Sequence, residues 1–138
     1  MLTVTFGSIF DDDADYLVCP VNSVGVMGAG LAKQFKMRYP GIEDVLKLYC
    51  QSGLLQPGQI AYASNTIFAA TKDHWKQPSK IEWVEGICEQ LAYSPPCSIA
   101  VPALGCGLGG LKWGHVFAIM KKYFEDQPEV DFRVYQPA

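Results

Sequence analysis

The chain has 138 residues, of which 49% are hydrophobic and 18% charged, a composition that excludes a disordered protein. Its 11 Lys and Arg against 14 Asp and Glu give a net charge of −3, which argues against a long basic face for nucleic acid. We expect a single domain over residues 1–138, large enough to bury its own core.

The five cysteines form an odd set without a Cys-x-x-Cys pair, which predicts reduced, mostly buried thiols. Neither histidine has a ligand-like spacing with a cysteine, so we expect no metal and no cofactor. The N-terminus lacks a basic segment followed by a long apolar run, and no apolar stretch approaches the length of a membrane span. These features predict a soluble, cytoplasmic monomer that does not bind membranes.

Six short β-favouring segments are expected as strands, at residues 2–6, 16–20, 59–63, 66–70, 98–101 and 132–135. Apolar residues at helical spacing predict four helices, with buried stripes over residues 31–39, 42–49, 81–91 and 116–124. Helices fall between most of the strands. The sequence therefore predicts an α/β fold of three layers, α/β/α, with a mixed, mainly parallel central sheet.

Local signals add detail between these elements. Ser79 and Glu82 match the Ser-x-x-Glu pattern of a capping box, which predicts that the third helix begins at Ser79. Residues 71–78 are expected to form a polar connection before it. The acidic run of residues 11–13 with Asp15 is most simply a solvated loop.

Two glycine-rich loops follow predicted strands, at residues 21–30 and 102–110, and each leads towards a helix. Glycines allow successive backbone N–H groups to face one concavity, and a helix N-terminus adds free N–H groups and a positive dipole end. In a parallel sheet both loops lie at the carboxyl ends of strands, where open α/β sheets bind ligands. The expected ligand is an anion, most often a phosphate or diphosphate.

The second loop has other interpretations. Residues 105–110 match Gly-x-Gly-x-x-Gly, and Asp131 follows about twenty residues later, as in a dinucleotide-binding unit. Only one helix and one strand remain after the motif, which leaves no room for such a unit. Neither loop ends in Gly-Lys-Ser/Thr, so a P-loop is not supported, whereas a plain strand-to-helix turn stays open for this loop by itself.

Taken together, the loops resemble those of macrodomains, a family of ADP-ribose-binding α/β/α proteins. Residues 19–35 resemble the first binding loop of that family, and residues 102–113 resemble the phosphate-cradling second loop. Residues 70–75 resemble the Thr-Lys segment of the branch of ADP-ribosyl glycohydrolases that includes DNA ADP-ribosyl glycohydrolase antitoxins and the terminal ADP-ribose glycohydrolase of animals. The antitoxins usually carry a second domain, for which we expect no room here.

The resemblance implies a hydrolase that removes ADP-ribose from modified DNA bases (thymidine) or from acidic protein side chains. Its partners would be ADP-ribose or an ADP-ribosylated macromolecule, either DNA or protein. Lys72 matches the catalytic lysine, whose amine can attack the electrophilic anomeric carbon or trap the opened ribose as a Schiff base. If the acceptor is DNA, Lys72, Lys76 and Lys80 at four-residue spacing are expected to meet a few phosphates.

The residues implied to bind substrate fall in four segments. In these segments Asn22 is expected to orient the distal ribose, and the glycines to hold the diphosphate. The full set is Ser8, Ile9, Asn22, Val26, Met27, Gly28, Ala29, Gly30, Leu31, Thr71, His74, Gly105, Cys106, Gly107, Leu108, Gly109 and Gly110.

Two positions depart from the family pattern. Ser8 stands where an Asp usually accepts the adenine amino group, and Gly109 stands where the animal enzyme has an acid. Two other functions therefore stay open: a reader that binds ADP-ribose without turnover, and a phosphatase acting on ADP-ribose 1″-phosphate.

Overall fold

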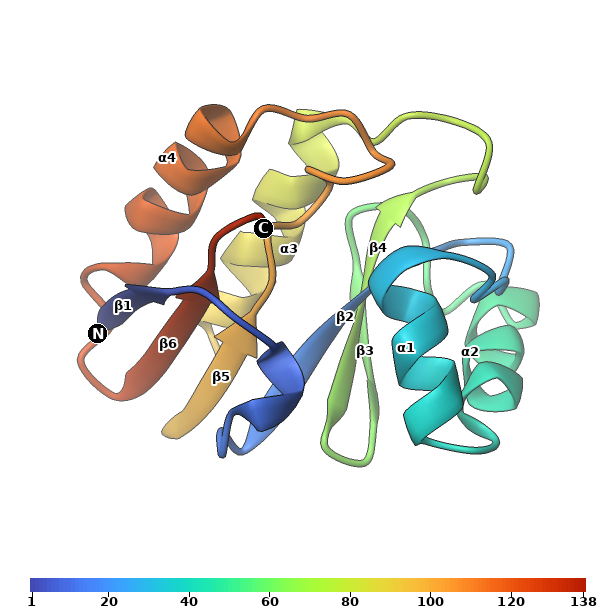
Figure 1. Ribbon diagram of the computed structural model, residues 1–138, viewed down its shortest axis with the longest axis horizontal. Helices are drawn as coiled ribbons and strands as arrows, with labels where there is room; N and C mark the ends of the chain where they lie inside the picture. Colours follow the sequence, from blue (N-terminus) through green and yellow to red (C-terminus); the bar gives the residue numbers. More distant parts are fainter.

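A six-stranded sheet separates two layers of helices in the computed structural model, which describes residues 1–138 (Figure 1). The strands are β1 (Leu2–Thr5), β2 (Tyr16–Asn22), β3 (Ile60–Ala63), β4 (Thr66–Lys72), β5 (Cys97–Val101) and β6 (Val130–Tyr135). The helices are α1 (Gly30–Arg38), α2 (Ile42–Gln51), α3 (Ile81–Ala92) and α4 (Trp113–Phe124), with a short 3₁₀ helix at Ile9–Asp11. No helix is long and apolar enough to cross a membrane.

The strand order is β1-β6-β5-β2-β4-β3, and every neighbouring pair is parallel except the antiparallel pair β3–β4. The prediction of a mixed, mainly parallel sheet is therefore confirmed. Helices α1 and α2 cover one face of the sheet, and α3 and α4 cover the other (Figure 1).

Strand β2 shows why the sheet is covered on both faces. Val18 packs into the cluster beneath α3 and α4, whereas its neighbours Leu17 and Cys19 pack into the cluster beneath α1 and α2. Successive side chains of a strand point to opposite faces, so a continuously apolar strand needs a helical layer on each side. The three-layer prediction follows from this pattern and is also confirmed.

The five cysteines form no disulfide, and Cys19 and Cys88 are buried while the other three are half-buried. Burial raises the pKa of each thiol, that of Cys88 to about 12. Thiols held in the protonated form are poor nucleophiles, and this includes Cys106 in the second glycine loop.

The capping-box prediction is wrong. Helix α3 begins at Ile81 after Lys80, and no side chain caps it. Ser79 instead contacts the second glycine loop, where its backbone N–H donates to the carbonyl of Gly109 at 3.0 Å. Its hydroxyl is buried and has no hydrogen-bond partner. The polar connection also starts later than predicted, because Thr71 and Lys72 belong to β4.

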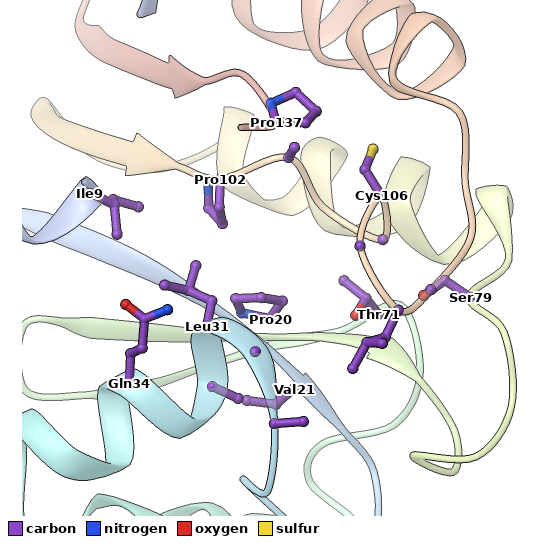
Figure 2. Close-up of a pocket in the computed structure, with 18 of the residues that line it drawn as sticks. Ile9, Pro20, Val21, Leu31, Gln34, Thr71, Ser79, Pro102, Cys106 and Pro137 are labelled. Atoms are coloured by element: carbon purple, nitrogen blue, oxygen red, sulfur yellow. The ribbon is translucent and has the colours of Figure 1, made fainter. Parts of the chain in front are cut away.

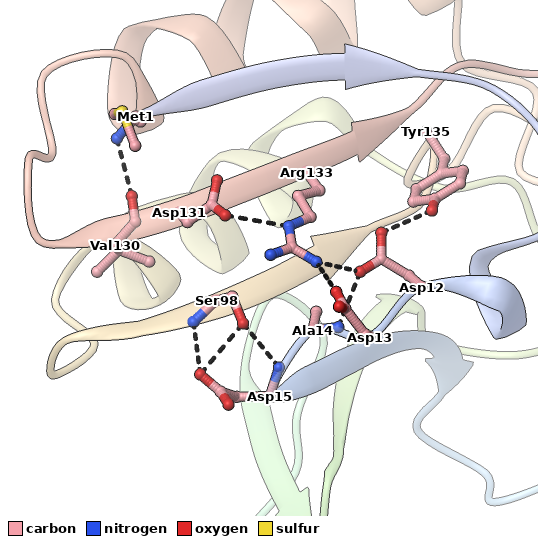
Figure 3. A network of polar contacts seen from close by, with 10 residues as sticks. All are labelled: Met1, Asp12, Asp13, Ala14, Asp15, Ser98, Val130, Asp131, Arg133 and Tyr135. Carbon is pink, nitrogen blue, oxygen red and sulfur yellow. Dashed lines mark hydrogen bonds and ion pairs between the residues drawn. The ribbon is translucent and has the colours of Figure 1, made fainter.

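The acidic run was predicted to be a solvated loop, and this is wrong for Asp12. Its side chain is only 6% exposed, and it accepts hydrogen bonds from Arg133 at 2.7 Å and from the Tyr135 hydroxyl at 2.6 Å (Figure 3). Burial raises the pKa of Asp12, but the hydrogen bonds from Tyr135 and Arg133 outweigh this and hold it below its ordinary value. The network ties the segment after β1 to the end of β6.

A second contact holds the same connection against β5. The Asp15 carboxylate accepts hydrogen bonds from the backbone N–H and the hydroxyl of Ser98, at 2.8 and 3.1 Å. The Ser98 hydroxyl also accepts from the N–H of Asp15 at 2.8 Å (Figure 3). The connection between β1 and β2 is thus fixed to two other strands.

The buried carboxylate of Asp12 should make stability depend on pH. We expect Asp12→Asn to lower the free energy of unfolding at pH 7 by about 1–3 kcal/mol, because a charged hydrogen-bond acceptor is lost. The pKa of Asp12 is depressed in the folded state, so its contribution is present above the unfolded pKa of about 3.9 and lost as pH falls through the folded pKa. Urea unfolding should therefore show the difference from wild type shrinking below about pH 4.

Asp13→Asn is the matched control, since Asp13 also contacts Arg133 but its side chain is 93% exposed. We expect this control to change stability by less than about 0.5 kcal/mol. Equal losses in the two variants would contradict the assignment of the stabilisation to the buried carboxylate.

Candidate functional site

A cavity of about 950 Å³ opens at the carboxyl ends of β2, β4 and β5 (Figure 2). Its walls come from both glycine loops, the segment after β1, the N-terminus of α1, the end of β4 with the connection that follows it, and the segment after β6. The volume is in the range of pockets that bind cofactors and other small molecules.

The register of the sheet brings the first loop beside Lys72. Strand β2 pairs with β4, and an irregularity between Val21 and Asn22 places Asn22 opposite Lys72 rather than Thr71. Both residues therefore sit at the same edge of the sheet and line the cavity. The adjacent pairing of β2 with β5 brings the second loop to this edge as well.

The side chain of Asn22 organises the first loop. Its Oδ1 accepts hydrogen bonds from the N–H groups of Val24, Gly25 and Val26, at 3.1, 2.9 and 3.2 Å. Its Nδ2 donates to the Val26 carbonyl at 2.9 Å. One amide hydrogen is left for a ligand. Asn22 is thus chiefly a scaffold of the loop, which sequence reasoning did not anticipate.

Helix α2 also holds the first glycine loop in place. Glu43 Oε2 accepts a hydrogen bond from the backbone N–H of Met27 at 2.8 Å, and Lys36 and Lys47 pair with its other oxygen at 3.2 and 3.6 Å. The Met27 N–H holds the pKa of Glu43 below its ordinary value. The Met27 side chain is fully buried in the core and does not line the cavity, so the prediction that it touches substrate is not supported.

The N-terminus of α1 forms part of the cavity wall. The backbone N–H groups of Gly30, Leu31 and Ala32 have no protein acceptor, because the first hydrogen bond of this region runs from Lys33 to Ala29. Free N–H groups and the positive end of the helix dipole favour an anion at this position.

The second loop is shaped by two obligatory glycines. Gly105 has φ +73°, and a Cβ there would lie 2.7 Å from Leu111 Cδ1. A Cβ at Gly109 would lie 2.3 Å from the Ser79 hydroxyl and 2.5 Å from the carbonyl of Gly105. No side chain fits at position 109, so a carboxylate cannot be placed there without rebuilding the loop.

The turn leaves several donors free. Three internal hydrogen bonds close the loop: Cys106 to Ala103, Gly110 to Gly107, and Leu111 to Gly105. The N–H groups of Gly107, Leu108 and Gly109 have no protein acceptor. Since these residues line the cavity, they can bind an anion from the side opposite α1.

Lys72 is half-buried at the end of β4, and its Nζ donates to the Trp75 carbonyl at 3.3 Å. It forms no ion pair. Thr71 beside it is 4% exposed, and its hydroxyl has no protein partner. His74 stacks on Trp75 with ring centroids 5.3 Å apart, and does not line the cavity.

All the predicted residues line the cavity except Met27, His74 and Gly110. No Asp or Glu side chain lines it, and no group of three or more His, Cys, Asp and Glu could hold a metal ion. Sequence reasoning missed wall residues with no glycine signal, among them Phe10, Gln34, Trp75, Ser79, Pro102 and residues 135–138. The last group is brought to the cavity only by the pairing of β6 with β1 and β5.

No protein-family model matches the chain. Over 150 residues it is 35% identical to a DNA ADP-ribosyl glycohydrolase of Mycobacterium tuberculosis, covering 100% of this chain and 43% of that protein. The solved macrodomain of M. tuberculosis DarG superposes with a TM-score of 0.93 at 34% identity, covering 100% of this chain and 99% of that one. The chain belongs to the macrodomain family.

Another structural relative of this macrodomain is Thermosipho africanus DarTG in complex with ADP-ribose. It has a TM-score of 0.90 and 30% identity, covering 99% of this chain and 41% of that chain. The present macrodomain thus spans well under half the length of this relative and of the M. tuberculosis glycohydrolase.

The contact between Ser79 and Gly109 gives a test of the loop geometry. We expect Gly109→Ala to lower the free energy of unfolding by about 1–3 kcal/mol, because the new methyl group overpacks the loop. Adding Ser79→Gly should restore only part of the loss, since the Gly105 carbonyl still obstructs the methyl group. Thermal unfolding followed by calorimetry measures both.

Gly114→Ala is the matched control, because a Cβ at this position in α4 meets no atom within 4 Å. Alanine is the better helix former, so the control should be no less stable than wild type. A Gly109→Ala protein as stable as this control would show that the loop does not need glycine at that position.

Proposed function

We propose that this macrodomain binds ADP-ribose and hydrolyses the bond that joins it to a DNA base. The observation that carries the proposal is the meeting of Lys72 with both glycine loops at one cavity. The names of the M. tuberculosis and Thermosipho relatives support it. Because the chain matches only part of those proteins, the activity is proposed for this domain alone.

The diphosphate lies between the two loops in this proposal. The free N–H groups of Gly30 and Leu31 meet it from the α1 side, and those of Gly107 and Leu108 meet it from the other. The α1 dipole adds favourable electrostatics without a counter-ion. Backbone donors suit this role because they are fixed before the ligand arrives.

Adenine would occupy the end of the cavity near Ile9 and Gln34, away from Thr71 (Figure 2). The Ser8 hydroxyl accepts a hydrogen bond from the Phe10 N–H at 3.3 Å, so it works mainly as the cap of the 3₁₀ helix. Gln34 points into the cavity in Figure 2. Its amide can both donate to and accept from an adenine edge, which suits it to replace the missing acid.

The distal ribose would then lie against Asn22, Thr71 and Lys72. The free amide hydrogen of Asn22 and the unpartnered hydroxyl of Thr71 are available to sugar hydroxyls. Lys72 is the only charged side chain on the wall. A mechanism that uses two carboxylates would therefore find no Asp or Glu in this cavity.

Lys72 acts as the nucleophile in the mechanism that we propose. Its unprotonated amine attacks C1″ while the bond from C1″ to the base nitrogen breaks, and the base leaves with the bonding electrons and takes up a proton from water. The hydroxide left by this proton transfer takes the proton from the adduct, and the ribose ring then opens to a Schiff base on Lys72. Water hydrolyses the Schiff base and releases ADP-ribose. Lys72 needs no carboxylate partner for these steps.

A test of this function is release of ADP-ribose from a thymidine-modified single-stranded oligonucleotide. We expect Lys72→Ala and Lys72→Arg to slow release by roughly 100-fold or more, as for other lost catalytic groups, with little change in the dissociation constant for free ADP-ribose. Lys121→Ala, on the exposed side of α4, is the matched control and should equal wild type.

Reduction with cyanoborohydride during turnover should trap the adduct on Lys72 in the wild-type protein, detected by mass spectrometry. Release at wild-type rate by Lys72→Ala would contradict the catalytic role.

The absence of any Asp or Glu from the wall favours one second candidate, a reader without turnover. Tight ADP-ribose binding by calorimetry, with no product from either DNA or protein linkages, would identify the domain as a reader.

A further inference from the structure

The Trp75 side chain lies at the Lys72 end of the cavity. Trp75 lines the cavity, yet 48% of it is exposed, whereas aromatic side chains of this size are usually well buried. Its carbonyl accepts the hydrogen bond from Lys72 Nζ at 3.3 Å, so backbone and catalytic amine are joined directly. If C1″ of the distal ribose lies beside Lys72, as the proposed function has it, a group attached to C1″ would leave the cavity near Trp75.

The segment that carries Trp75 is held in place at both ends. The His74 ring stacks on the indole at an interplanar angle of 29°, and its Nδ1 accepts a hydrogen bond from the N–H of Lys76 at 3.1 Å. Further along, the N–H of Ser79 donates to Gly109. These contacts hold the segment that carries the indole, and both Trp75 and the exposed Leu108 of the second loop line the cavity.

The charges around the indole are mainly positive. Lys76 and Lys80 are exposed and form no ion pairs, and Asp73 is the one carboxylate between Lys72 and Lys80. The Lys76 ammonium lies 5.0 Å from the centroid of the Trp75 ring. The Lys80 ammonium lies over the Trp83 ring, 5.2 Å from its centroid. An aromatic face beside lysines without ion-pair partners suits a nucleobase flanked by phosphates, as in single-stranded nucleic acid binding.

We propose that Trp75 recognises the acceptor by stacking on the nucleobase that carries ADP-ribose, while Lys76 and Lys80 meet the flanking phosphates. This rests on the proposed function. An exposed cation–π contact is weaker than base stacking, so the base displaces the Lys76 ammonium, which is then free to reach a phosphate. A base can reach the indole only when it is unstacked from its neighbours, which selects a single-stranded or extruded nucleotide.

The test compares Trp75→Ala and Trp75→Phe with wild type on an ADP-ribosylated single-stranded oligonucleotide. We expect Trp75→Ala to raise KM and the dissociation constant for this substrate by roughly 10- to 100-fold, from the loss of stacking, with kcat changed less than about threefold. Trp75→Phe should retain most of the affinity. The dissociation constant for free ADP-ribose should be unchanged in both, because the stack lies beyond the distal ribose.

Two controls, Tyr93→Ala and a modified peptide, and one charge variant, Lys76→Ala, define the effect. Tyr93→Ala removes another exposed aromatic side chain, at the end of α3, and should leave every constant unchanged. Lys76→Ala should reduce the slope of log affinity against log salt by about 0.7, the value for one phosphate of a single strand. A peptide ADP-ribosylated on an acidic side chain should be bound equally by wild type and Trp75→Ala.

Trp75→Ala binding the oligonucleotide as tightly as wild type would overturn the proposal. So would an equal loss of affinity for the peptide or for free ADP-ribose, because Trp75 would then contact something other than the base. A wild-type protein that releases no ADP-ribose would refute the proposed function instead. The dissociation constants of Trp75→Ala and wild type for the oligonucleotide would still decide the role of Trp75.

Discussion

Strand β2 pairs in parallel with β4 on one side and β5 on the other, and the site depends on this arrangement. Three neighbouring strands then end at the same edge of the sheet, and each is followed by a connection that forms part of the cavity wall. The irregularity in the β2–β4 register puts Asn22 opposite Lys72. A cavity lined by two glycine-rich loops and one lysine follows from the topology.

The two halves of the wall are joined by the contact of Ser79 with Gly109. The hydrogen bond between their backbones fixes the connection after β4 to the second glycine loop, and the Ser79 hydroxyl fills the space that a side chain at position 109 would need. Together with the Gly105 carbonyl, this contact leaves no room for a carboxylate side chain in the second glycine loop. Lys72 is the only charged side chain on the cavity wall, and the catalytic role that we propose for it rests on this position.

Much of this site could be predicted from the sequence, because glycine clusters and a Thr-Lys pair are local signals. The fold class followed from apolar strands alternating with amphipathic helices. Other features depend on contacts between residues far apart in the chain. Asp12 is buried against Arg133 and Tyr135, which lie on a strand at the other end of the sequence. Ser79 does not cap α3, and its N–H donates to Gly109 instead. Met27 is fully buried in the core beneath α1 and α2, and its N–H donates to Glu43 of another helix.

Glycine amides offer a direct view of the central claim, that the two loops hold one diphosphate through their backbones. With glycine labelled by ¹⁵N, the 13 glycines of the chain report on the cavity and on the rest of the surface in one NMR spectrum. On titration with ADP-ribose, the amides of cavity glycines, among them Gly30 and Gly107, should shift together, while those of Gly53 and Gly114 stay in place. Shifts confined to only one loop, or to glycines outside the cavity, would contradict the account.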